Sequence, residues 1–407
     1  MSELPFLFCN GKAVSYSELL CFVCNAKNCK CVLSAKDTKQ FFFELVCAFA
    51  YGNDICLVDS DTTQSELFAL GIKNAEKTQA ICEAKKINSL SDLLECVKNS
   101  PSKITLFTSG TTGLPKKVIH TVKTLSRAVR VSEKYKAHIW GFAYNPTHIA
   151  GLQVFLQAFF NLNEVVFLFG ETPERIFSLV DSKKITHISA TPTFYRMLLG
   201  KDSAFKSVLR ITCGGEKSDN VLYAKLAKQF PCAKINNIYA ATEFGTLLVC
   251  SGEYFSVPNS LADKIKVQNN NLYVHKSLMG VSDLLPDFGE WYKTGDLVEF
   301  VDPEKTKFRF IARQCNLVNT GGYKVNIEEV EDALRQMPQV ADVAVYGKKN
   351  SVIGNILCAD IKLAKNAELE IPQIRNFLTE KLQPFKIPRK ITFVESLKQT
   401  ATGKLKR

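Results

Sequence analysis

The chain has 407 residues, with 52 Lys and Arg against 40 Asp and Glu, which gives a formal net charge of +12. Its length is enough for two domains, and its hydrophobic fraction of 46% is ordinary for a globular protein. The lysines are spread along the chain rather than clustered with aromatic residues, which argues against nucleic acid and favours small anionic ligands or an acidic protein partner. We see no apolar run long enough for a membrane span and no secretory signal, so we expect a cytoplasmic protein.

The 14 cysteines include one dense group near the N-terminus, namely Cys21, Cys24, Cys29 and Cys31. Its CxxC half resembles part of a zinc site. However, Ser15 and Glu18 form a capping box that predicts the start of a helix, and that helix carries Cys21 and Cys24 on one face. Cys29 and Cys31 fit alternate positions of a following strand. The pattern therefore favours reduced structural thiols over bound zinc.

Helical patterns then alternate with short apolar runs. Residues 39–50 are predicted to be helical, and strands are predicted at 54–58, 104–107, 165–169 and 185–189. Short buried strands separated by helices are typical of parallel sheets that are covered by helices on both faces. We therefore predict an α/β fold whose large N-terminal body, residues 1–313, consists of helix-covered β-sheets.

A different pattern begins near residues 313–319. It predicts, in order, a helix at 327–336, strands at 341–346 and 356–363, a helix at 371–382 and a strand at 390–394. Residues 314–407 are thus expected to form a small C-terminal α+β domain.

A segment rich in glycine and hydroxyl residues follows the strand at 104–107: Thr108–Lys117 reads TSGTTGLPKK. Glycines let backbone N–H groups converge on an anion, and the hydroxyls and Lys116 add donors and charge. Pro115 stands where a P-loop needs its second glycine, which disfavours a P-loop kinase or GTPase. We predict a phosphate cradle made by Thr108, Ser109, Gly110, Thr111, Thr112, Gly113 and Lys116.

This segment resembles the signature loop of the adenylate-forming (AMP-binding) superfamily, and further motifs of that family follow in order. They are IYAATEFGT at 238–246, YKTGDL at 292–297, ARQCNLVNTGGYKVNIEEVE at 312–331 and the closing TATGKLKR. The resemblance covers nearly the whole chain. The short region before the first loop is similar to compact acyl- and aryl-CoA ligases of the o-succinylbenzoate–CoA ligase type.

The resemblance implies ATP-dependent activation of a carboxylic acid, either small aromatic or short to medium acyl. The product would be an acyl-adenylate, formed with release of pyrophosphate and passed to the thiol of coenzyme A. One alternative acceptor is the phosphopantetheine arm of an acyl carrier protein. Another alternative is a non-catalytic adenylate-binding protein, because Ala240 and Cys315 replace residues usual in the family. The charged residues that the chemistry needs are all retained, which argues for an enzyme.

The same resemblance assigns catalytic roles. Lys404 would bridge the attacking carboxylate and the phosphate, Thr242 would bind a phosphate oxygen, and Glu243 would bind Mg²⁺. His148 would gate the acid pocket or contact the carboxylate of the acid. The pocket for the acid is expected at His148, Gly151, Thr191 and Pro192.

Nucleotide-binding roles are implied for a second set of residues. Tyr239 and the turn of Gly214, Gly215 and Glu216 would contact adenine, and Asp296 and Arg313 would bind the ribose. The small domain would carry Lys404 into the site and then swing away about Cys315. That motion would present Gly321 and Gly322 on the side of the thiol acceptor.

Overall fold

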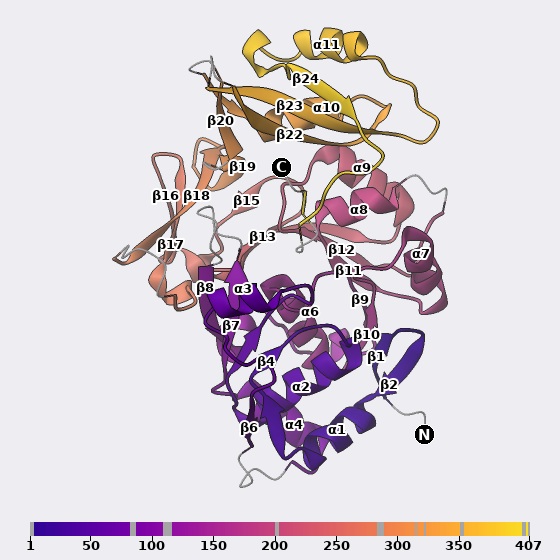
Figure 1. Ribbon diagram of the computed structural model, residues 1–407, viewed down its shortest axis with the longest axis vertical. Helices are drawn as coiled ribbons and strands as arrows, with labels where there is room; N and C mark the ends of the chain where they lie inside the picture. The colour runs from indigo at the N-terminus through magenta and orange to yellow at the C-terminus, as the bar shows by residue number, and fades with distance from the viewer. Residues whose placement is uncertain are drawn as a thin grey trace.

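The computed structural model describes residues 4–81, 87–108, 116–199, 203–282, 289–313, 316–320, 323–350, 354–400 and 404–405. A large N-terminal body carries a small C-terminal module on one end (Figure 1). Within these ranges, no helix combines the length and the apolar character that crossing a membrane requires.

An eight-stranded sheet forms the middle of the body. Its central strands run parallel, and an antiparallel strand closes each edge. In spatial order the strands are β14 (Gly245–Cys250), β13 (Lys234–Ala241), β12 (Arg210–Gly214), β11 (His187–Ala190), β9 (Ile139–Phe142), β10 (Glu164–Phe167), β1 (Pro5–Cys9) and β2 (Lys12–Ser15). The predicted strands at 165–169 and 185–189 are confirmed, with bounds shifted by one or two residues.

Helices make the crossovers between the parallel strands, as such connections require. They are α6 (Ile149–Phe159), α7 (Pro173–Ser182), α8 (Pro192–Leu198) and α9 (Asn220–Gln229). The carboxyl ends of β11, β12 and β13 consequently lie at one edge of the sheet, and the turns that follow them are neighbours.

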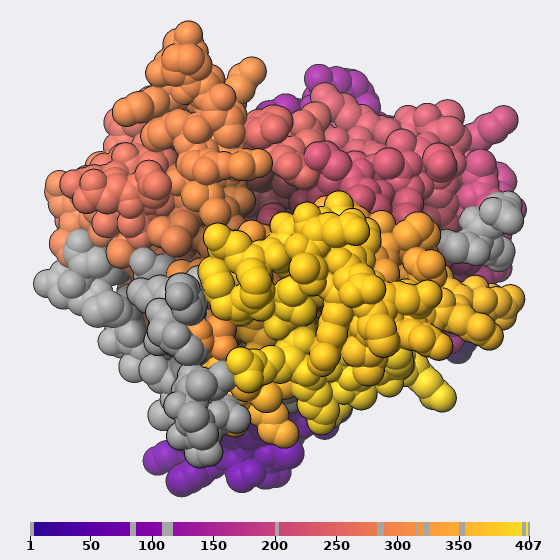
Figure 2. All heavy atoms as spheres, turned by 90° about the horizontal axis from the view of Figure 1, so that it is seen from above, coloured from indigo at the N-terminus to yellow at the C-terminus, as the bar shows by residue number. Residues whose placement is uncertain are grey.

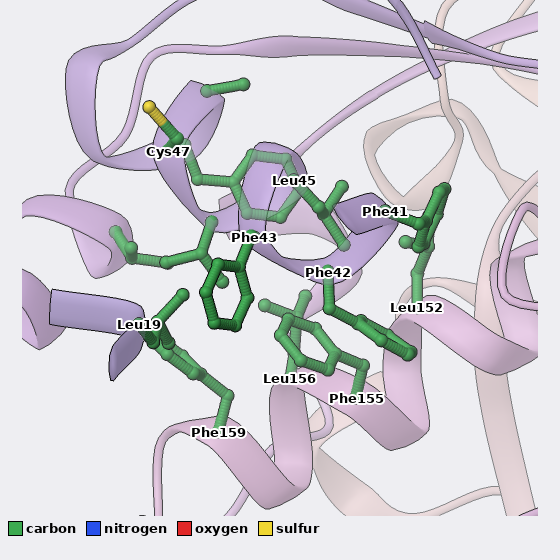
Figure 3. Packing of buried hydrophobic residues seen from close by; sticks show 14 of the residues in the cluster. Leu19, Phe41, Phe42, Phe43, Leu45, Cys47, Leu152, Phe155, Leu156 and Phe159 are labelled. Carbon is green, nitrogen blue, oxygen red and sulfur yellow. The ribbon is translucent and has the colours of Figure 1, made fainter. Parts of the chain in front are cut away.

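A second sheet contains β4 (Val32–Leu33), β5 (Ile55–Leu57), β7 (Lys103–Thr108) and β8 (Lys116–Thr121). The predicted helix at 39–50 is present as α2 (Thr38–Tyr51). Its phenylalanines pack against α6 in a continuous apolar core, where the rings of Phe42 and Phe155 stack at 4.8 Å (Figure 3). This packing fixes α6, and with it His148, relative to both sheets.

The N-terminal helix has the predicted start. The Ser15 side chain accepts a hydrogen bond from the backbone of Glu18, and the Glu18 carboxylate accepts one from the backbone of Ser15. Cys21 and Cys24 lie on this helix, α1 (Tyr16–Asn25), and Cys29 lies on β3 (Asn28–Lys30), which pairs with β6 (Thr78–Ala80). The remaining helices of this part are α3 (Gln64–Ala69), α4 (Leu90–Lys98) and α5 (Val122–Leu125).

A third, antiparallel sheet completes the body and precedes the module in the chain. Its strands are β15 (Phe255–Ser256), β19 (Lys307–Arg313), β18 (Trp291–Phe300), β17 (Asn271–His275) and β16 (Ile265–Gln268). Sequence patterns indicated only that this region is rich in strands. The register pairs Asp296 on β18 with Arg313 on β19, so the two residues predicted to bind ribose are directly opposite each other.

The C-terminal module begins with the ribbon β20 (Leu317–Thr320) and β21 (Tyr323–Asn326), which the sequence did not predict. The predicted order of elements then follows: α10 (Ile327–Leu334), β22 (Val340–Asn350), β23 (Gly354–Leu363), α11 (Ile371–Thr379) and β24 (Lys390–Phe393). The module buries a core of its own, which includes Val330, Val343 and Ile374. Seen from above, these C-terminal residues sit on the end of the body (Figure 2).

Candidate active site

Three predicted site segments meet because they follow neighbouring parallel strands. Thr191 comes directly after β11, Gly215 after β12 and Thr242 after β13. In open α/β sheets, ligands bind outside the carboxyl ends of the strands, where the loops diverge. The main sheet therefore gathers residues that are far apart in the sequence at its ligand-binding edge.

Lys404 lies directly over the glycine turn after β12. Gly215 has φ +84°, and a Cβ added to it would lie 3.3 Å from Lys404 Cε and 3.9 Å from Thr191 Cγ2. Gly215 can adopt this left-handed backbone conformation without strain, and its lack of a side chain leaves room for Lys404. The C-terminal segment therefore lies at this edge of the sheet.

The ammonium group of Lys404 has an unusual environment. The side chain is partly buried, and within the described ranges no acceptor lies at hydrogen-bond distance from its Nζ. Burial lowers the pKa of Lys404, although the carboxylates of Glu216, Glu243 and Asp296 oppose that effect. A desolvated cation without a hydrogen-bond acceptor is unfavourable by itself. An anionic ligand bound between Lys404 and the body would stabilise it.

The backbone that carries Thr242 and Glu243 is clamped from three directions. The consecutive carbonyls of residues 242–244 accept hydrogen bonds from His120 Nε2 at 2.7 Å, from Gly280 N at 2.7 Å and from Arg127 Nη2 at 2.6 Å. No hydrogen bond or ion pair of the Thr242 hydroxyl or the Glu243 carboxylate is found among the described residues. These side chains can therefore bind a ligand without giving up an internal partner.

His120 was not predicted to belong to the site. Burial lowers its pKa, so the ring is neutral, and Nε2 must carry the proton because the Thr242 carbonyl can only accept. Nδ1 lies 3.2 Å from Thr124 Oγ1. The partner carbonyl is 122 residues away, and no local pattern in the sequence could have revealed this contact.

His120→Ala is expected to destabilise the protein by about 1–3 kcal/mol, because it leaves a buried carbonyl without a donor. It should also weaken AMP binding, since the loop that carries Thr242 loses one of its clamps. Denaturant unfolding and calorimetric titration with AMP measure the two effects. His275→Ala removes a histidine outside the buried core and serves as the control. Equal stabilities of the two variants would contradict the clamping role.

Tyr239, Asp296 and Arg313 form a connected group. Tyr239 Oη donates a 2.6 Å hydrogen bond to Asp296 Oδ2, and Arg313 Nε lies 3.4 Å from Asp296 Oδ1. Burial, together with Asp296, raises the pKa of Tyr239, so its hydroxyl stays protonated and donates. Each carboxylate oxygen keeps a further acceptor position, which leaves Asp296 able to bind a pair of hydroxyls. One face of the Tyr239 ring is covered by Phe310 at 4.4 Å.

His148 is held by an acidic residue that sequence reasoning missed. It is the N-cap residue of α6, and its Nε2 lies 3.0 Å from Asp59 Oδ1. The same oxygen accepts hydrogen bonds from Asn145 Nδ2 at 2.9 Å and Thr147 Oγ1 at 2.7 Å. Burial alone would raise the pKa of Asp59, but these three neighbours hold it below its ordinary value. Asp59 lies two positions after the buried strand β5, and this position is the sequence feature that could have identified it.

The three other residues predicted for the acid pocket have clear packing roles. Thr191 caps α8 through a hydrogen bond from Phe194 N, and Pro192 occupies the first turn of that helix. Gly151 is packed tightly, since a Cβ there would lie 2.5 Å from the Asn145 carbonyl oxygen. Thr191 nevertheless faces Gly215 and stands beside Lys404, whereas Gly151 serves the contact between α6 and the preceding loop.

The phosphate cradle and the hinge fall largely outside the described residues. This applies to Ser109, Gly110, Thr111, Thr112, Gly113, Cys315, Gly321 and Gly322. Thr108 ends β7 and Lys116 begins β8, and the two are paired in the antiparallel register.

The fold and this arrangement of residues define the class of protein. The model of the AMP-binding enzyme family matches residues 15–272, and the model of the AMP-binding enzyme C-terminal domain matches residues 329–404. The first match covers more than half of the chain, which therefore belongs to the AMP-binding enzyme family.

Individual relatives are named as acyl-coenzyme A synthetases and CoA ligases. A mitochondrial acyl-coenzyme A synthetase of Pongo abelii is 26% identical over 379 residues, covering 78% of this chain and 61% of the relative. A 2-succinylbenzoate–CoA ligase of Listeria innocua is 26% identical over 340 residues, covering 78% of this chain and 71% of the relative. The chain spans 61% to 68% of the length of the first curated relatives that it matches.

Solved structures show the same fold over almost the entire chain. The o-succinylbenzoate–CoA synthetase of Bacillus subtilis, in complex with its acyl-adenylate intermediate, superposes with a TM-score of 0.72 at 20% identity, covering 99% of this chain and 94% of that one. ATP-bound MatB of Rhodopseudomonas palustris gives 0.74 at 17% identity, with 98% and 94% covered. The predicted α/β architecture with a small C-terminal module is thus confirmed.

Proposed function

We propose that this protein activates a carboxylic acid with ATP, forms an acyl-adenylate with release of pyrophosphate, and transfers the acyl group to the thiol of coenzyme A. The observation that carries the proposal is the desolvated ammonium of Lys404, which has no described acceptor and lies near Glu243, Asp296 and Arg313. Two anions, a carboxylate and the α-phosphate, must approach each other in the first step. A cation held at that point lowers the repulsion between them.

Each residue of the site has a defined task in this step. Asp296 and Arg313 orient the ribose, and Tyr239 fixes Asp296 while offering its ring to adenine. Thr242 donates to a phosphate oxygen. Glu243 supplies the hard carboxylate ligand that a magnesium ion prefers, and the bound ion would neutralise charge on the phosphates. The segment from Thr108 to Lys116 binds the departing pyrophosphate.

The acid is assigned to the side of the site where His148 lies. Its ring is oriented by Asp59, and Thr191 and Pro192, at the start of α8, are assigned to the same pocket. The 2-succinylbenzoate–CoA ligase and the acyl-coenzyme A synthetase among the relatives support a small aromatic or a short to medium acyl group.

We also propose that residues 1–313 and 314–407 act as two domains. The separate core of the C-terminal module and the distinct match of its family model support this division. Cys315 is the proposed pivot, and Gly321 and Gly322 would face the thiol acceptor after the module rotates.

Acid-dependent exchange of labelled pyrophosphate into ATP tests the first half-reaction. A panel of aromatic, short-chain and medium-chain acids should give exchange with one class, which then identifies the substrate. ATP binding without exchange across the whole panel would oppose the proposal and favour a non-catalytic adenylate-binding protein. Coenzyme A and a phosphopantetheinylated carrier protein, added separately, then identify the acceptor, since the basic charge of the chain also suits an acidic carrier.

The pH dependence of the exchange follows from Lys404. Because burial lowers its pKa, the ammonium loses its proton at a lower pH than an exposed lysine does. The exchange rate should therefore fall as pH rises through this pKa, below about 10.4. The residual rate of Lys404→Arg should lack this alkaline loss, since a guanidinium stays charged. Parallel profiles of the two proteins would contradict the assignment.

A further inference from the structure

Two adjacent residues of the turn between β12 and α9 contact the C-terminal module. Glu216 Oε1 accepts a 2.9 Å hydrogen bond from the backbone N–H of Leu405, and Lys217 Nζ lies 2.7 Å from Asp332 Oδ2 on α10. The first contact is next to Lys404 itself. The second lies at α10, the first helix of the module, so the two contacts join the body to this helix and to the C-terminal segment.

The body holds the Glu216 carboxylate in the position where it contacts Leu405. Its other oxygen, Oε2, accepts hydrogen bonds from Thr193 N at 3.0 Å and Thr193 Oγ1 at 2.7 Å. These bonds do not involve the module, so the carboxylate stays in place whether or not Leu405 is present. The sequence predicted a role for Glu216 beside adenine, but the described contacts of its carboxylate are with Thr193 and the C-terminal segment.

The C-terminal segment is shaped to meet Glu216. Thr400 N donates to the Lys404 carbonyl at 2.8 Å, and Lys404 N donates to Thr400 Oγ1 at 3.2 Å. Gln399 and Leu405 form an antiparallel bridge. With these contacts, the Leu405 N–H is directed to the body and the Lys404 side chain to Gly215.

Lys217 meets an excess of negative charge on the module. Arg335 is paired with three carboxylates, those of Glu331, Asp332 and Asp342, and one cation leaves that group with two uncompensated negative charges. Burial works against the charge of Lys217, but Asp332, with Glu328 and Glu253, raises its pKa above the ordinary value. The contact is thus an ion pair between complementary surfaces.

We infer that Glu216 and Lys217 form a two-point latch that holds the module where Lys404 occupies the site, and that they are positioning residues for the adenylation step. The inference rests on the proposed function, in which the module must also leave. Lys404 alone would favour departure, because its desolvated charge is unfavourable before an anion binds. The latch opposes that tendency. The ion pair between Lys217 and Asp332 is partly exposed, so breaking it costs little free energy.

Chemical labelling of Lys404 tests the latch without any substrate. An amine-reactive acetylating ester labels lysines in proportion to their exposure, and mass spectrometry resolves each site. Lys404 should be labelled slowly in the apo-protein, relative to the exposed Lys398. Lys217→Met should raise the labelling rate of Lys404 about fivefold, because that factor corresponds to the free energy of one partly exposed ion pair. Glu216→Gln should raise the labelling rate as well. Lys228→Met on the exposed face of α9 is the matched control and should change nothing.

A charge exchange makes the test specific. Lys217→Asp places two carboxylates together and should raise the labelling rate further than Lys217→Met does. Adding Asp332→Lys restores an ion pair in the opposite sense, while Arg335 keeps Glu331 and Asp342. The double variant should then return to within about twofold of the wild-type rate.

The outcomes separate the latch from the proposed function. Lys404 labelling that is unchanged in Lys217→Met and Glu216→Gln overturns the latch, and so does a double variant that labels as fast as Lys217→Asp alone. Melting temperatures of the variants check that the fold persists. Because labelling needs no turnover, a protein that shows the predicted labelling but no pyrophosphate exchange with any acid would retain the latch and lose the proposed function.

Discussion

Lys404→Ala should lower acid-dependent pyrophosphate exchange by at least about 10²–10³-fold, the cost of losing one preorganised electrostatic group at a reacting centre. The same variant should largely keep its ability to form the thioester from a preformed acyl-adenylate. The physical reason is that the ammonium is needed while carboxylate and α-phosphate approach each other. Once the adenylate exists, that repulsion is gone, and the lysine is expected to have left the site with the module.

Lys398→Ala, six residues earlier and exposed, is the matched control and should keep both half-reactions. Single-turnover measurements of each half-reaction separate the effects. If Lys404→Ala slowed both half-reactions equally, the lysine would be acting on the structure of the module or on a shared step, and the role assigned to it would be wrong.

Asp296→Ala should weaken AMP binding by about 10²-fold, as measured by calorimetry. The carboxylate offers charge-assisted acceptors to the ribose hydroxyls, and each such hydrogen bond contributes about 1.5–3 kcal/mol. Its removal also leaves the buried Tyr239 hydroxyl without its partner and frees Arg313 from its ion pair.

Tyr239→Phe provides the comparison. It removes the 2.6 Å hydrogen bond to Asp296 but keeps the ring and the carboxylate, so the loss of AMP affinity should be much smaller than in Asp296→Ala. Comparable losses in the two variants would place the ribose elsewhere and make Asp296 a structural partner of Tyr239.

Local patterns predicted much of the fold, and physical reasons explain where they failed. Buried parallel strands are continuous apolar runs, so residues 104–107 and 165–169 were predicted as strands from the sequence alone. The capping box at Ser15 likewise depends on residues three apart. The ribbon of β20 and β21 was missed, because its residues alternate only briefly and belong to a motif that was interpreted for function.

The site shows the same division between local and long-range information. Tyr239, Thr242, Asp296 and Lys404 were predicted as site residues because each lies in a short motif. Their supporting residues were not, because the contacts join distant parts of the chain: Asp59 and His148 are 89 residues apart, and Glu216 and Leu405 are 189 apart.

The central claim is that a carboxylate attacks the α-phosphorus of ATP in this site. The measurement that tests it most directly uses the acid found by the exchange panel, labelled with oxygen-18 in its carboxylate, and follows the label by mass spectrometry after turnover with ATP and coenzyme A. Attack on the α-phosphorus predicts one labelled oxygen in the phosphate of AMP. Label in inorganic phosphate with formation of ADP, or AMP without label, would contradict the account.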